Sequence, residues 1–265
     1  MTFLVYQLRN AMGEVQLGWE TIEIGGHQTD VFQPDRPHSS GHVVIYLHGV
    51  HLGRLRGNGP VTELLRSTGL ACVAPMTGPS WWLDVVCPAF DAEQTPEAHL
   101  RKNVLPWIKL NFGQKPPLVG LIGTSMGGQG AIRLALKSPQ DFPVAAGLAP
   151  AVDFHTWMAD GDPILGAMFE SVEAARQETA LLQIQPLNWP RHLWFCCDPE
   201  DDRWWDSSDK LAMKLSSMGV PYECDLETSA GGHGWDYYNQ MFAPALEFVV
   251  RGLQSEQRRL SPNGD

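Results

Sequence analysis

The sequence predicts an α/β fold, a doubly wound and mainly parallel sheet of about eight strands that is covered by helices. Short apolar runs recur along the chain with helical segments between them. Most of these runs are continuously hydrophobic rather than alternating, which indicates strands that are buried on both faces. The chain has 265 residues, 43% hydrophobic and 18% charged, enough for one large core without a second domain.

The predicted strands begin with a hairpin and continue as buried runs. Residues 15–24 and 28–34 flank Gly25 and Gly26, and this pattern predicts two antiparallel strands at one edge of the sheet. The β-type runs that follow, most of them continuously hydrophobic, are residues 42–49, 70–76, 117–125, 144–150, 192–198 and 222–229.

Two connections are longer than a simple crossover needs, residues 76–103 and 151–191. The second spends about 40 residues where a parallel crossover needs about a dozen. We expect a helix around residues 164–182 there, as part of a small, cap-like helical insertion. A last helix is predicted over residues 239–253, so that residues 1–254 form one domain and residues 255–265 a solvated tail.

Charge and composition exclude several classes of partner. The formal net charge is −11 and the basic residues form no long run, which argues against nucleic acid and anionic membranes. No apolar run approaches the roughly 18 residues of a membrane span, and residues 1–16 lack the pattern of a signal peptide. We therefore expect a cytoplasmic protein. The five cysteines show neither a disulfide framework nor zinc-binding spacing, and no metal or cofactor is expected.

Ser125 is the candidate nucleophile. It lies in GTSMG, between a predicted strand and a predicted helix, which fits the GxSxG turn that lifts a serine hydroxyl above a sheet. Gly123 and Gly127 would flank a turn too tight for a Cβ atom. The alternative interpretation is a glycine-rich turn in which the serine is incidental.

A serine hydroxyl needs a positioned base, and the base needs an acid that fixes its tautomer. His233, in SAGGHGWDYY, follows the last predicted strand on a glycine-flanked loop and is the candidate base; the alternative is a histidine of a surface loop. The acid should come from the loop after residues 192–198. If Asp198 takes the position of the glycine in an hhGxxD pattern, the acid is Asp201, and Trp204 follows it as DxxW. Asp202 is the second choice.

Two backbone N–H groups are the candidate oxyanion hole. They belong to Met126, directly after the serine, and to Val50, in the turn after the first buried strand. His48 precedes this turn, and we expect it to orient the loop rather than to catalyse. Large side chains in the two long connections and the acid loop are candidates for a substrate pocket: Trp81, Trp82, Trp157, Met168 and Trp204.

These motifs resemble the α/β-hydrolase superfamily from about residue 40 to residue 253. The resemblance rests on YLHG, GTSMGG, DPEDDRWW and GGHGWDYY. GGHGWDYY, together with WW and TPE after residues 70–76, is closest in style to serine esterases of the esterase D and S-formylglutathione hydrolase group. The sequence departs from that group in the turn HGVHLGRLRG and in the extra aspartate of the acid loop.

The resemblance implies an α/β-hydrolase fold and a cofactor-free serine hydrolase. Such an enzyme cleaves small-molecule carboxylic esters through an acyl-enzyme on Ser125, here with small to medium acyl groups. The same triad would equally serve a thioesterase or a peptidase. A catalytically idle binding protein of this fold is the alternative from another class. The sequence leaves the oligomeric state open.

Overall fold

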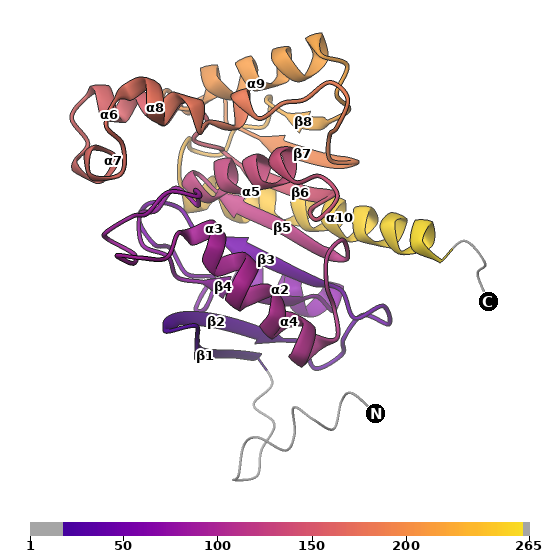
Figure 1. Cartoon of the computed structure of the whole chain (residues 1–265). Coiled ribbons are helices and arrows are strands. Elements are labelled where there is room, and N and C mark those ends of the chain that lie inside the picture. The colour runs from indigo at the N-terminus through magenta and orange to yellow at the C-terminus, as the bar shows by residue number, and fades with distance from the viewer. Residues whose placement is uncertain (1–17, 262–265) are drawn as a thin grey trace.

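The computed structural model describes residues 18–261, and these form an eight-stranded sheet in the order β1-β2-β4-β3-β5-β6-β7-β8 (Figure 1). The predicted fold class is confirmed. The strands are β1 (Gly18–Ile24), β2 (His27–Gln33), β3 (Val43–Leu47), β4 (Ala71–Pro75), β5 (Val119–Thr124), β6 (Val144–Leu148), β7 (His192–Cys196) and β8 (Glu223–Asp225).

The N-terminal edge of the described sheet is antiparallel, as predicted. β1 pairs with β2 through a turn at Gly25 and Gly26, whose φ angles of 56° and 84° suit glycine. β2 then pairs antiparallel with β4, and every later pairing is parallel. The predicted residues 15–17 lie outside the described residues.

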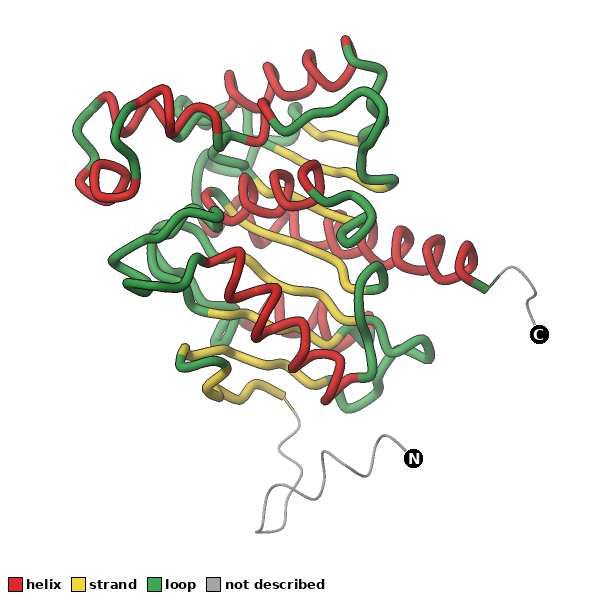
Figure 2. Tube along the Cα trace, in the orientation of Figure 1, coloured by secondary structure: helices red, strands yellow, loops and turns green. Residues whose placement is uncertain are grey.

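Helices cover both faces of the sheet, and Figure 2 shows them in red against the yellow strands. α2 and α10 contact each other on one face, while α4, α5 and α9 cover the other (Figure 1). Within residues 18–261, no helix is long and apolar enough to cross a membrane. The bounds are α2 (Gly59–Thr68), α3 (Pro96–His99), the π-helical turn η1 (Leu100–Val104), α4 (Leu105–Phe112), α5 (Met126–Lys137), α9 (Trp205–Ser217) and α10 (Trp235–Leu260).

The insertion after β6 contains several short helices, so the single helix expected around residues 164–182 is wrong. Phe169 is extended (φ −129°, ψ 144°), and the Ser171 side chain accepts from the Ala174 N–H and starts a new helix. The insertion lies beyond the carboxyl ends of the parallel strands, on the same side of the molecule as the long loop after β4 (Figure 1). Its helices are α6 (His155–Ala159), α7 (Pro163–Met168), α8 (Val172–Gln177) and the 3-10 turn η2 (Ala180–Leu182).

The last helix is longer than predicted at both ends. α10 begins at Trp235 and continues to Leu260, so residues 255–260 are helical and not part of a solvated tail. Glu256 is only 1% exposed because Arg191 Nε and Nη2 each donate to its carboxylate at 2.6 Å. The polar residues 255–260 can therefore continue the packed helix, because the buried charge of Glu256 is paired with Arg191. Residues 262–265 of the predicted tail lie outside the described residues.

A buried ionic cluster joins α5 to both long connections. Arg133 on α5 is 1% exposed, and its Nη1 donates to Glu97 Oε2 at 3.0 Å. Its Nε donates to the Glu178 carbonyl at 2.9 Å, and its Nη2 to the Glu178 carboxylate. One guanidinium thus ties the helix after Ser125 to α3 and to the end of the insertion.

Arg133→Met is expected to lower the free energy of unfolding by about 3 kcal/mol, because it leaves the buried Glu97 carboxylate with fewer positive partners. Arg176→Met is the matched control. Arg176 pairs with Glu173 at the surface, where an ion pair contributes little. Urea unfolding of both variants checks the expectation. Equal stability of the two variants would contradict it.

Candidate active site

Ser125 occupies the tight turn between β5 and α5. Its backbone is in an unusual conformation, with φ 54° and ψ −116°, which is costly for a non-glycine residue. A Cβ atom at Gly123 would lie 2.1 Å from the Gly127 carbonyl oxygen, and one at Gly127 would lie 1.8 Å from the Leu47 oxygen. Only glycine fits these two positions, so the motif GTSMG holds the serine at the sharpest point of the chain.

His233 lies within hydrogen-bond distance of the serine. Its Nε2 is 2.9 Å from Ser125 Oγ, although 108 residues separate the two in sequence. The loop that carries His233 turns at Gly231 and Gly232, which have φ angles of 86° and 76°. The Ser125 residue is 7% exposed and the His233 side chain 28%, so the pair is reached from one side of the surface.

Asp201, and not Asp202, contacts the histidine. Asp201 Oδ2 is 2.7 Å from His233 Nδ1, and its Oδ1 accepts from the N–H groups of Arg203 and Trp204 at 3.1 Å each. Burial acts to raise the pKa of Asp201, but these hydrogen bonds outweigh it and lower the pKa below its usual value. An ionised Asp201 keeps the proton on Nδ1, which leaves Nε2 free to accept from Ser125.

Asp198 anchors the histidine loop, a role that the sequence did not indicate. Its carboxylate is fully buried, and Oδ2 accepts from the N–H groups of Ala230 and Gly232 at 2.6 and 2.9 Å. Its Oδ1 accepts from the Glu200 N–H at 2.8 Å, so one side chain joins the acid loop to the histidine loop. These N–H groups lower the pKa of Asp198 although burial acts to raise it.

Tyr238 is a second residue that the sequence did not indicate. It lies in the first turn of α10, five residues after His233, and its hydroxyl is 2.9 Å from His233 Nε2. The spacing of five residues could have predicted this contact, because side chains in the first turn of a helix point back toward the residues that precede it. In the sequence, however, an aromatic residue at position 238 suggests core packing, so the role of its hydroxyl was not predicted.

The two candidate oxyanion donors belong to segments that adjoin Ser125. Met126 is the first residue of α5, where a helix leaves its N–H groups without internal partners. Val50 follows Gly49, and a Cβ atom at Gly49 would lie 3.4 Å from Ser125 Cβ. The turn after β3 therefore runs directly past the serine.

His48 holds this turn in place. Its Nε2 accepts from the Thr77 N–H at 3.1 Å, which leaves the proton on Nδ1 to donate to the Gly49 carbonyl at 2.9 Å. Burial lowers the pKa of His48 to about 4, so the ring stays neutral near pH 7. The Trp82 Nε1–H donates to the His48 carbonyl at 3.0 Å.

Three of the predicted pocket residues, Trp81, Trp157 and Trp204, form an aromatic arc that runs from Met126 to Asp201. The Trp81 N–H donates to Met126 Sδ at 3.2 Å, and the Trp81 ring lies 5.6 Å from the Trp157 ring. The Trp157 ring in turn lies 5.5 Å from the ring of Trp204. Trp81, Trp82 and Trp204 are almost fully buried, and Met168 is 9% exposed.

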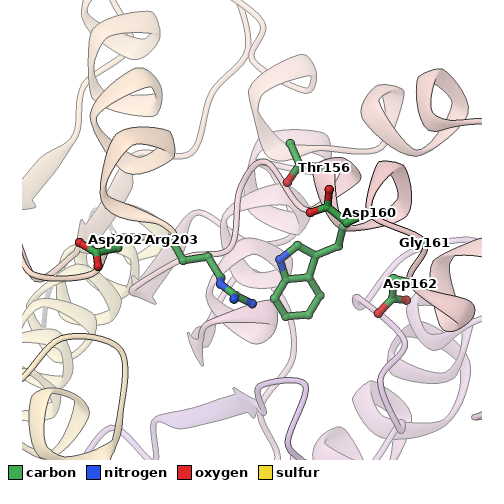
Figure 3. A pocket seen from close by; sticks show the side chains of 7 residues that line it. Thr156, Asp160, Gly161, Asp162, Asp202 and Arg203 are labelled. Atoms are coloured by element: carbon green, nitrogen blue, oxygen red, sulfur yellow. The ribbon is translucent and has the colours of Figure 1, made fainter.

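An open hollow of about 640 Å³ borders this arc at Trp157. Figure 3 shows the side chains of Asp202 and Arg203 pointing in opposite directions from adjacent positions in its wall. Arg203 Cζ lies 5.0 Å from the centre of the Trp157 ring, a cation–π contact. Asp202 thus borders solvent and not His233. The hollow is lined by Thr156, Trp157, Asp160, Gly161, Asp162, Asp202 and Arg203.

Other chemistry finds little support among residues 18–261. No group of three or more His, Cys, Asp or Glu side chains is placed to hold a metal ion there. Burial raises the pKa of the Cys72, Cys196 and Cys197 thiols, which keeps them protonated and unreactive near pH 7. The Ser125 hydroxyl, in contrast, lies 2.9 Å from an imidazole nitrogen.

The family model described as "Esterase: Putative esterase" matches residues 26–249. A fluorophosphonate-binding serine hydrolase of Staphylococcus aureus is similar at 17% identity and a TM-score of 0.70, over 88% of this chain and 99% of the other. An S-formylglutathione hydrolase of Agrobacterium tumefaciens is similar at 16% identity and a TM-score of 0.70, over 92% and 99%. No curated protein sequence matches the chain.

Asp198→Asn is expected to lower the free energy of unfolding by about 2 kcal/mol at pH 7, because an amide cannot accept the three N–H bonds that the carboxylate accepts. The native pKa of Asp198 is depressed, so its contribution is present above the unfolded value of 3.8 and is lost as the pH falls through the native value. The difference between variant and wild type should therefore shrink below about pH 4. Urea unfolding from pH 7 to pH 3 measures it, and a constant difference would refute the assignment.

Proposed function

The chain belongs to this esterase family and is a carboxylic-ester hydrolase, and we propose that it acts through an acyl-enzyme on Ser125. His233 is the base and Asp201 the acid of the proposed triad. The observation that carries the proposal is the unbroken line of hydrogen bonds from Asp201 Oδ2 through the imidazole to Ser125 Oγ, at 2.7 and 2.9 Å.

The proposed reaction has two steps. His233 Nε2 removes the Ser125 proton while Oγ attacks the ester carbonyl, and the same proton then passes to the leaving alcohol. A water molecule next gives a proton to Nε2 and attacks the acyl carbon, and the proton returns to Ser125 Oγ as the carboxylic acid leaves. Throughout, the Asp201 carboxylate stabilises the transient imidazolium.

The proposed oxyanion hole consists of the Met126 and Val50 N–H groups. Both lie beside Ser125, where the carbonyl oxygen of a bound ester gains negative charge. Such donors contribute several kcal/mol to transition-state stabilisation, typically about 3 kcal/mol each. The neutral His48 supports this role indirectly, because its bond to the Gly49 carbonyl fixes the peptide that precedes Val50.

We propose that the substrate is a small-molecule ester with a small to medium acyl group. The aromatic arc of Trp81, Trp157 and Trp204 runs from Met126 to Asp201, and Ser125 itself is only 7% exposed. A long acyl chain would have to displace buried rings. The triad alone would also suit a thioester or peptide bond, and the arc does not distinguish between these bonds.

Ser125→Ala and His233→Ala should each lower kcat by roughly 10⁶-fold, because the members of a triad act as a unit. p-Nitrophenyl acetate turnover measures this effect, and thermal unfolding verifies that both variants fold. Wild-type protein should react with a fluorophosphonate probe at Ser125, whereas Ser125→Ala should not. A folded wild-type protein that the probe does not label would be a binding protein and not an enzyme.

Asp201→Asn should lower kcat by roughly 10⁴-fold, because the amide favours the wrong tautomer of the histidine. Asp202→Asn is the matched control, with the same chemical change one residue along the loop. It should leave kcat within about twofold of wild type, because Asp202 borders the solvent-filled hollow. If the two variants exchanged their effects, Asp202 and not Asp201 would be the acid.

Acetyl to butyryl esters should be hydrolysed with a higher kcat/KM than esters with acyl chains of about eight carbons or more. Each methylene should change the activation free energy by up to about 1–3 kcal/mol. Trp157→Ala and Met168→Ala should shift this preference toward longer chains, because each removes a large side chain from the proposed wall of the acyl site. Met213→Ala is the control, because Met213 is 64% exposed on α9. Unchanged profiles in both wall variants would mean that the insertion only supports the sheet.

A further inference from the structure

Two hydroxyl groups meet the same nitrogen of the proposed base. Ser125 Oγ and Tyr238 Oη each lie 2.9 Å from His233 Nε2. Because Asp201 occupies Nδ1, Nε2 offers a single lone pair, which can accept fully from one hydroxyl at a time. The proposed triad uses the Ser125 hydroxyl, and this leaves the Tyr238 hydroxyl without a role in it.

The fold holds Tyr238 firmly in this position. The Tyr238 N–H donates to the Gly234 carbonyl at 2.9 Å, and the residue is 6% exposed. Its ring stands edge-on to the rings of His233 and Trp235, with centroids 5.6 Å apart in each case. Burial raises the pKa of Tyr238 far above neutrality, so the hydroxyl stays uncharged and can both donate and accept.

The acyl-enzyme changes what surrounds Nε2. Once Ser125 Oγ is bonded to the acyl carbon, it has no proton to donate. His233 has by then given its proton to the leaving alcohol, so Nε2 again presents a lone pair. The Tyr238 hydroxyl stays beside that lone pair through both changes. A water molecule that donates one proton to Nε2 therefore lies within reach of Tyr238 Oη as well.

We propose that Tyr238 is a catalytic residue of deacylation, whose Oη accepts a hydrogen bond from the hydrolytic water while His233 Nε2 accepts that water's other proton. The inference rests on the proposed function. The water oxygen bonds to the acyl carbon, the bond from that carbon to Ser125 Oγ breaks, and the proton on Nε2 passes to Oγ. Tyr238 keeps its own proton, and it fixes the direction from which the water attacks.

Tyr238→Phe tests the proposal because it removes only the hydroxyl. The enzyme is acetylated with p-nitrophenyl acetate, and the burst of p-nitrophenolate gives the acylation rate. The return of activity after removal of the ester gives the deacylation rate. We expect deacylation to slow about 10-fold, the effect of losing one hydrogen bond in the transition state, and acylation to stay within about twofold. As a result kcat and KM should fall together.

Tyr237→Phe is the matched control. It makes the same change on the same turn of α10, at a residue that is fully buried in the core. Both rates should equal those of wild type. Equal deacylation rates in Tyr238→Phe and wild type would overturn the proposal, and so would an equal loss in both steps.

Hydroxylamine provides a second measurement that a structural effect would not alter. It attacks the acyl-enzyme with less help from a base than water needs, so it should largely remove the difference between Tyr238→Phe and wild type. A difference that persists in hydroxylamine would count against a role in holding water. If wild type formed no acetyl-enzyme and did not react with a fluorophosphonate, the proposed function itself would fail, and the inference with it.

Discussion

The close contact between α5 and the strands beside it is the constraint on which the rest of the structure depends. Gly127 packs against the Leu47 carbonyl so tightly that even a methyl group would overlap it. Ser125 consequently takes a strained backbone, which neighbouring strands stabilise: its N–H donates to the Leu148 carbonyl at 2.8 Å, and its carbonyl accepts from the Ala151 N–H at 3.1 Å. Strain of this kind persists only where the surroundings over-determine it. Here the surroundings are buried strands at the centre of the sheet, so the position of the serine is fixed by the core.

The histidine is positioned in a different way, because it lies on a loop and not on the core. Two carboxylates from the loop after β7 hold it: Asp201 bonds the ring, and Asp198 bonds the backbone of the loop that carries the ring. The helix that follows adds Tyr238 from the other side. The loop thus presents its imidazole in a defined orientation, because Asp201, Asp198 and Tyr238 hold the ring and its backbone.

Much of this arrangement could be predicted from the sequence, and the exceptions have physical reasons. Continuous apolar runs specify buried parallel strands, and the glycine spacing around Ser125 specifies the turn, so both follow from local patterns. The sequence did not reveal the role of Asp198, because its partners are backbone N–H groups 32 and 34 residues away. The prediction of a single helix in the insertion was wrong because Ser171 caps a new helix. The continuation of α10 to Leu260 was not predicted because Glu256 pairs with Arg191, which is distant in sequence. The catalytic roles of Ser125, His233 and Asp201 stay predictions until the variants are measured.

The Arg133 cluster has a consequence for how such a protein can diversify. Arg133 and Gln129 on α5 attach the last part of the insertion through hydrogen bonds to Glu178 and to the Ala180 N–H. The stretch between Asp153 and Glu178 makes the wall near Trp157 but does not carry that attachment. Exposed positions of this stretch, such as Asp160 and Ala167, can therefore be substituted without disturbing α5, whereas Leu165 and Ala175 are fully buried in the core. Under the proposed function, the wall near Trp157 can thus change during evolution while the turn that carries Ser125 stays the same.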